Sequence, residues 1–190
     1  MTTRLTLNAS PSAGFDQPFE MLQACHQRVL RMLQLLERLA AHVVHHAADE
    51  SAQQAALDIC RYFDLAGPDH HEDEEKHLFP ALLAQGESQV VAMVCQLQAD
   101  HRCMLQQWVA VREDLMGIAG GAAPPAQASS LRWREFTELY QRHIEQEERV
   151  VYPAAESLFN EAAERTMGAE MAARRGAFVG LNPKSPTAKV

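Results

Sequence analysis

Apolar and polar positions follow one another in steps of three and four along most of the chain, the spacing of an amphipathic helix. This pattern predicts helices over residues 16–48, 51–83, 88–117 and 131–158, and a short helix over 160–174. β-Branched residues are scattered, and no alternating run is long enough to indicate a strand. The chain is therefore expected to be all-α.

Short polar joints near residues 49 and 86, and a stretch rich in Gly, Ala, Pro and Ser over 118–130, separate the four long helices. Short joints favour antiparallel neighbours, so the sequence predicts an up-down-up-down four-helix bundle over residues 16–158. Residues 159–190 are expected to add the short C-terminal helix and a flexible tail.

Each long helix carries one histidine where its apolar seam would place an aliphatic residue: His26, His70, His101 and His143. On the third helix the seam is expected to include Leu105. The four histidines lie at nearly matching distances from the turns that join their helices, with mismatches of about 3 Å at 1.5 Å of rise per residue. The bundle topology therefore places them in one layer.

One segment of the chain occurs twice. Residues 70–80 read HHEDEEKHLFP, and residues 143–153 read HIEQEERVVYP. In each copy the first histidine is followed four residues later by a glutamate, Glu74 or Glu147. Residues i and i+4 share one face of a helix, so each copy offers an imidazole and a carboxylate to the same point.

A buried layer of four imidazoles and two carboxylates is costly unless cations neutralise it. Neutral imidazole and ionised carboxylate are metal ligands, and a mixed nitrogen and oxygen set without thiolate suits iron or manganese, with zinc possible. The sequence thus predicts a site for two ions, both glutamates being able to bridge. The candidate ligands are His26, His70, Glu74, His101, His143 and Glu147.

Some histidines leave alternatives open. A rival register would pair His71 with Glu75, and His71 is also a candidate fifth imidazole. His77 either lines an access path or packs against its neighbours. The remaining histidines, at the end of the first helix, are expected to lie on the surface: His42, His45 and His46.

Composition narrows the functional classes. The net charge of −8 and the absence of a basic cluster argue against a nucleic-acid partner. No apolar run approaches the roughly 20 residues of a membrane span, and residues 1–15 lack a signal-peptide pattern. The 4 cysteines have no CxxC spacing, which favours reduced thiols and a cytoplasmic protein.

The paired HxxxEE strings, with a lone histidine on the first and third helices, resemble the bacterial hemerythrin-like, or HHE cation-binding, domain. The resemblance covers about residues 16–158 and implies two non-haem iron ions, oxo- or hydroxo-bridged, on the six residues named above. Leu105 stands where oxygen-carrying members have a second histidine, and the fourth helix has no aspartate after its HxxxE. The chain is closer to members with four histidines and two glutamates, which the resemblance links to nitric oxide and oxidative stress.

We therefore expect a protein that binds or senses a small diatomic ligand or a peroxide: oxygen, nitric oxide or hydrogen peroxide. The alternatives are a low-turnover di-iron oxidoreductase, an iron-donating repair protein, or a metal-free structural bundle. A ferritin-type centre would require two Glu-x-x-His motifs, and only Glu74 with His77 forms one at the level of the layer.

Overall fold

The computed structural model describes residues 14–122 and 127–177, and within them the regular structure is helical. In chain order the elements are α1 (Pro18–His45), α2 (Glu50–Asp73), the π-helical turn η1 (Glu74–Leu78), α3 (Phe79–Gln85), α4 (Ser88–Ala119), α5 (Gln127–Gln146), the π-helical turn η2 (Glu147–Val151), α6 (Tyr152–Glu156) and α7 (Glu161–Arg174). The all-α bundle expected from the sequence is confirmed.

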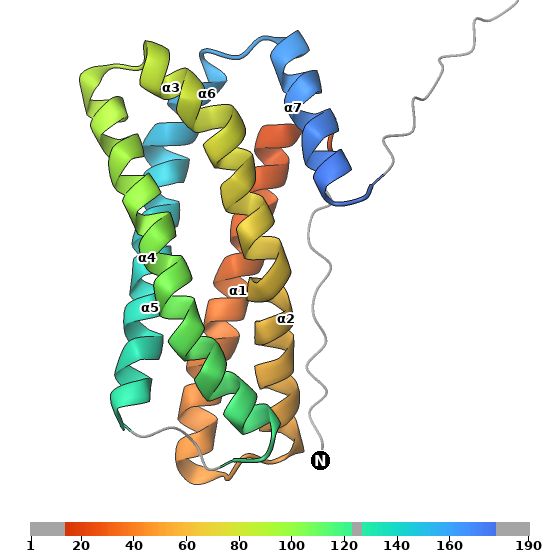
Figure 1. Cartoon of the computed structure of the whole chain (residues 1–190), viewed down its shortest axis with the longest axis vertical. Coiled ribbons are helices and arrows are strands. Elements are labelled where there is room, and N and C mark those ends of the chain that lie inside the picture. The colour runs from red at the N-terminus through yellow and green to blue at the C-terminus, as the bar shows by residue number, and fades with distance from the viewer. Residues whose placement is uncertain (1–13, 123–126, 178–190) are drawn as a thin grey trace, which may run out of the picture.

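Four long rods form the bundle. One rod is α1, the next runs from α2 through η1 into α3, the third is α4, and the fourth runs from α5 through η2 into α6. Figure 1 shows the chain reversing direction from each rod to the next. α1 and α4 each pack against both α2 and α5, so the rods enclose a shared core.

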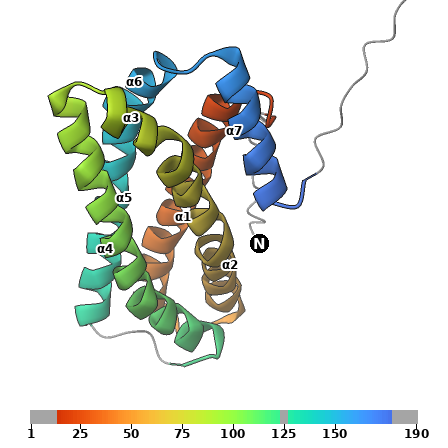
Figure 2. The same cartoon turned by 45° about the horizontal axis from the view of Figure 1, so that its top comes forward.

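α7 lies outside this ring, beside α1 and α2 (Figure 2). The side chain of Asn160 accepts hydrogen bonds from the backbone N–H groups of Ala162 and Ala163, which starts the helix. At its other end Arg174 and Arg175 both bind the carboxylate of Asp73, the residue before Glu74. The last helix is thereby tied to the segment that carries a candidate ligand.

The apolar core consists of two clusters of buried side chains. The larger one extends toward the joint between α1 and α2 and includes Leu33, Ile59 and Val111. The smaller one lies among the helix ends near α3, α6 and α7 and includes Leu22 and Leu97. The layer of candidate ligands falls between them, because on α1 His26 lies between Leu22 and the first member of the larger cluster.

The structure corrects three local expectations. α4 extends to Ala119 and α5 begins at Gln127, so the connection between them is shorter than the predicted 118–130. Glutamine and alanine favour helix, which is consistent with the earlier start of α5. Leu105, expected inward, is 65% exposed, and Met104 is buried in its place because the seam steps by three residues after His101. The first helix, predicted over residues 16–48, begins at Pro18 with Gln17 in the N-cap position and ends at His45.

Most of the tail expected to be flexible, residues 178–190, lies outside the described residues. Among the helices that are described, none combines the length and the apolar character needed to cross a bilayer.

The contact of α7 with the chain before α1 depends on a glycine. A Cβ built on Gly168 would collide with the backbone carbonyl oxygen of Phe15. Gly168→Ala should therefore lower the free energy of unfolding by about 1–3 kcal/mol, as overpacking does, measured by chemical denaturation. Gly117→Ala is the control: its Cβ would meet Ala122 at 3.8 Å, an ordinary contact, and the variant should be at least as stable as the wild type. Equal stability of the two variants would contradict this packing.

Candidate metal centre

The six candidate ligands lie together in one buried layer across the bundle. His101 is 7% exposed and the other five are 0–2% exposed. Each rod contributes a histidine and two rods add a glutamate: His26 from α1, His70 from α2, Glu74 from η1, His101 from α4, His143 from α5 and Glu147 from η2. The chain thus brings all six residues to one place, and their role as ligands remains a prediction.

The first donor group is formed by His26, His70, Glu74 and Glu147, whose ligand atoms all lie within 4.8 Å of one another. His26 Nε2 is 3.2 Å from Glu147 Oε2. His70 Nε2 is 3.5 Å from Glu74 Oε1. Around a six-coordinate ion with bonds of about 2.1 Å, neighbouring donors are about 3.0 Å apart and opposite donors about 4.2 Å. The group therefore has the spacing that one ion requires.

The second donor group is formed by His101 and His143 with the same two glutamates, again with all ligand atoms within 4.8 Å. His143 Nε2 lies 2.9 Å from Glu147 Oε1, and His101 Nε2 lies 3.5 Å from Glu74 Oε2. Each carboxylate therefore turns one oxygen toward the first group and the other toward the second. Two carboxylates in this arrangement could bridge a pair of ions.

A π-helical turn begins at each glutamate. The N–H of Phe79 bonds to the carbonyl of Glu74, and the N–H of Tyr152 to that of Glu147, five residues back in both cases. A proline follows each aromatic residue, and its ring cannot fit against the carbonyl four residues earlier, which favours the wider turn. The prolines of the repeated segment thus explain the π turns, an effect that the periodicity did not reveal.

The buried atoms of the layer suit a cation better than they suit one another. Three buried carboxylate oxygens, both of Glu147 and Oε2 of Glu74, have no neighbouring donor other than imidazole nitrogens. Unless protons on these imidazoles or a cation neutralise it, a buried carboxylate costs several kcal/mol. Ions placed among these oxygens and the imidazole nitrogens would remove that cost, so the donor set fits the metal pair expected from the sequence.

The second glutamate of each HxxxEE segment has a different role. Glu148 Oε1 lies 3.0 Å from Nδ1 of His26, and Glu75 Oε1 lies 3.1 Å from Nδ1 of His101. Each of these carboxylates fixes the ring of a histidine on another helix and directs its Nε2 inward. The repeated Glu-Glu pair was the available signal, and sequence reasoning did not assign the second member.

The layer is also strongly polarised. Burial alone would lower the pKa of His26, but the carboxylates of Glu147 and Glu148 outweigh it and raise the pKa to about 9. Burial is likewise outweighed at His143, where Glu147 and Asp100 raise the pKa to about 10. Burial and the charge of Glu147 raise the pKa of Glu74 well above its usual range. Without metal, protonation of His26, His143 and Glu74 is therefore favoured at the positions where ions would bind.

The structure places the other histidines as follows. His71 has a ring nitrogen within 4.8 Å of donor nitrogens of His101 and His143, and its ring stacks on His101 at 4.0 Å. Glu75, its partner in the rival register, binds His101 and is in none of the donor groups found among the described residues. His77 instead faces Glu170 of α7 at 3.7 Å. His45 is exposed, as expected.

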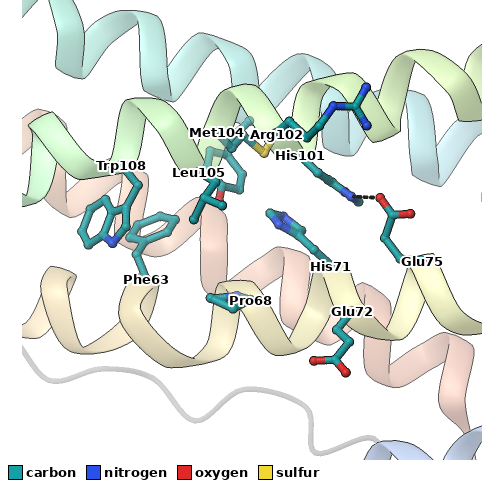
Figure 3. A pocket seen from close by; sticks show the side chains of 11 residues that line it. Phe63, Pro68, His71, Glu72, Glu75, His101, Arg102, Met104, Leu105 and Trp108 are labelled. Carbon is teal, nitrogen blue, oxygen red and sulfur yellow. Dashed lines mark hydrogen bonds and ion pairs between the residues drawn. The ribbon is translucent and has the colours of Figure 1, made fainter.

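A cavity of about 250 Å³ lies beside the second donor group. Figure 3 shows the rings of His71 and His101 at one side of it and Phe63 with Trp108 at the other. Leu105, exposed on α4, forms part of the wall. A water molecule occupies about 30 Å³ of the liquid. The cavity is therefore large enough for a small ligand to reach the imidazoles of the second group.

The comparisons with known proteins agree with this geometry. The model of the family described as "Hemerythrin HHE cation binding domain" matches residues 17–155. An uncharacterised protein of Haemophilus influenzae is 29% identical over 163 residues, which are 86% of this chain and 92% of that protein. The family match covers α1 to α6 apart from a residue at the end, and it includes every residue of both donor groups. The chain belongs to the hemerythrin HHE cation-binding domain family.

Proposed function

We propose that this protein holds two non-haem iron ions in the buried layer and uses them to bind or sense oxygen, nitric oxide or hydrogen peroxide. The main support is that Glu74 and Glu147 each direct one oxygen to each donor group. Two shared carboxylates hold a pair of ions close together. When bound, the iron pair supplies redox-active ions to which a small ligand can attach.

The choice of iron is supported by the donors. The two groups contain imidazole and carboxylate without thiolate, a set that suits iron and also accommodates manganese and zinc. Glu75 and Glu148 complete the set from outside by accepting hydrogen bonds from Nδ1 of His101 and His26. These bonds fix the tautomer, leaving both Nε2 atoms free to bind metal.

We propose the cavity as the ligand's route to the ions. It joins the exposed side of α4, at Leu105, to the rings of His71 and His101. Its walls are mostly apolar, which suits an uncharged diatomic molecule or peroxide. The protein is proposed to act in the cytoplasm, where its four unpaired cysteines would remain reduced.

Binding and turnover are separated by one experiment. The reduced, iron-loaded protein is mixed anaerobically with oxygen, nitric oxide or peroxide in turn, while absorption and ligand concentration are recorded. A binding protein takes up one equivalent and gives a stable spectrum that reverses when the ligand is removed. Repeated consumption of the ligand would contradict this proposal and indicate a low-turnover oxidoreductase. Transfer of iron to an acceptor would instead indicate an iron-donating repair protein.

The shared glutamate provides the test of metal binding. Glu147→Gln keeps the size of the side chain but removes the charge and one donor oxygen from the centre, so the purified variant should lose most of its iron. Elemental analysis measures the loss. His45→Ala, which changes an exposed histidine on α1, is the control and should retain the full load. Full iron content in the Glu147 variant would contradict the assignment.

Metal binding should release protons. At pH 7 the metal-free layer carries protons on His26 and His143, whose pKa values are about 9 and about 10. Ligands must lose these protons, so the apparent metal affinity should rise as the pH increases from about 6 to about 8. Titration calorimetry in buffers with different ionisation enthalpies gives the number released. A value of zero would show that these histidines do not bind the ion.

Narrowing the cavity should slow ligand entry. Leu105→Trp places a large ring in the cavity wall, and ligand association measured by stopped flow should become several-fold slower at unchanged iron content. Val109→Trp is the matched control, because Val109 is exposed one turn further along α4 and does not line the cavity. Equal rates for both variants would exclude this route.

A further inference from the structure

The two copies of the repeated segment differ in chemistry at two positions that face the layer. Where the first copy has His71, the second has Ile144, and where the first has Phe79, the second has Tyr152. Ile144 is 4% exposed and belongs to the larger apolar cluster. The two halves of the centre are therefore not chemically equal, although four of their six main donors are related by the repeat and each half adds one further histidine.

The aromatic positions occupy matching places around the two donor groups. Phe79 stacks on His101 with ring centres 5.6 Å apart and an interplanar angle of 18°. Tyr152 stacks on His26 with ring centres 5.3 Å apart and an angle of 10°. Each ring thus lies against the histidine of its donor group that comes from outside the repeated segment. Only the ring beside the first group carries an oxygen.

The hydroxyl of Tyr152 lies among the donor atoms of the first group. It donates a hydrogen bond of 2.5 Å to Glu74 Oε1 and lies 3.1 Å from His26 Nε2, and both of these atoms belong to the first donor group. Tyr152 is 0% exposed, so no solvent competes for the hydroxyl. The distance to His26 Nε2 matches the spacing of about 3.0 Å between neighbouring ligands of one ion with bonds of about 2.1 Å, and an ion that replaced the hydroxyl proton would separate the two oxygens to about the same spacing.

We infer that the oxygen of Tyr152 is a fifth protein donor to the ion held by His26, His70, Glu74 and Glu147. This inference rests on the proposed metal-binding function. On binding, the O–H bond of the phenol is replaced by an oxygen–metal bond, and the proton leaves on a water molecule that the entering hydrated ion gives up, with no change in the oxidation state of the ion. The result is an oxygen-rich position.

The second position gains a different fifth donor. A ring nitrogen of His71 lies within 4.8 Å of donor nitrogens of His101 and His143, and the cavity reaches the same ring. The exchange of His71 for Ile144 and of Phe79 for Tyr152 therefore gives one ion a phenol oxygen and the other an additional imidazole. The ion on the His71 side is the one that faces the cavity.

Spectroscopy of the oxidised, iron-loaded protein tests this inference. A phenolate bound to ferric iron gives an intense ligand-to-metal charge-transfer band at longer visible wavelengths than the absorption of an oxo bridge, and imidazole, carboxylate and a hydrogen-bonded phenol give no such band. We expect this band in the wild type and its loss in Tyr152→Phe. Tyr140→Phe is the matched control, since Tyr140 is also buried but its ring lies beside His71, and it should keep the band.

The outcomes separate this inference from the proposed function. Iron in the wild type without the band, or a band that persists in Tyr152→Phe, overturns the tyrosine ligand and leaves the metal centre intact. A wild type that binds no iron overturns both. If Tyr152→Phe fails to hold iron, resonance Raman spectra of the wild type excited in the band decide: phenolate ring vibrations support the ligand, and their absence overturns it.

Discussion

The desolvation of a charged layer is the constraint around which this bundle is organised. Four imidazoles and two carboxylates lie between two apolar clusters, and three of the four glutamate oxygens have only imidazole nitrogens beside them. The apolar clusters can stabilise the helices on either side, but they cannot replace the hydration that the buried charges lose. Only groups of opposite charge at close range can compensate for that loss. Binding of cations and folding of the bundle are therefore linked, because the ions bind the assembled layer and not the unfolded chain.

The duplicated segment supplies most of the polar side chains of this layer. Each copy gives one inward carboxylate, one histidine four residues before it, and a second carboxylate that fixes a histidine of a neighbouring rod. The contacts of Glu75 with His101 and of Glu148 with His26 are equivalent under the repeat. The prolines add the π turns that begin at the bridging glutamates. The positions where the copies differ are then the places where the two proposed metal positions would acquire different chemistry.

α7 adds a constraint from outside the ring of rods. Arg174 and Arg175 neutralise Asp73, a fully buried carboxylate one residue before Glu74. Glu170 on the same helix faces His77. The segment around Glu74 is thereby held from the side of α7 as well as from the core. The position of the Glu74 carboxylate thus depends on a helix at the end of the described chain.

Periodicity and repetition in the sequence were enough to determine the helices, the bundle and the six residues of the layer, because these follow from local spacing and from the positions of the turns. The position of Leu105, the start of α5 and the roles of Glu75, Glu148 and Tyr152 depended on the tertiary structure. Tyr152 meets His26 across 126 positions in the chain, and such a contact depends on how each helix is rotated about its axis. A spacing rule gives the face of a helix to within about one residue, whereas a metal ligand must be placed within a fraction of an ångström.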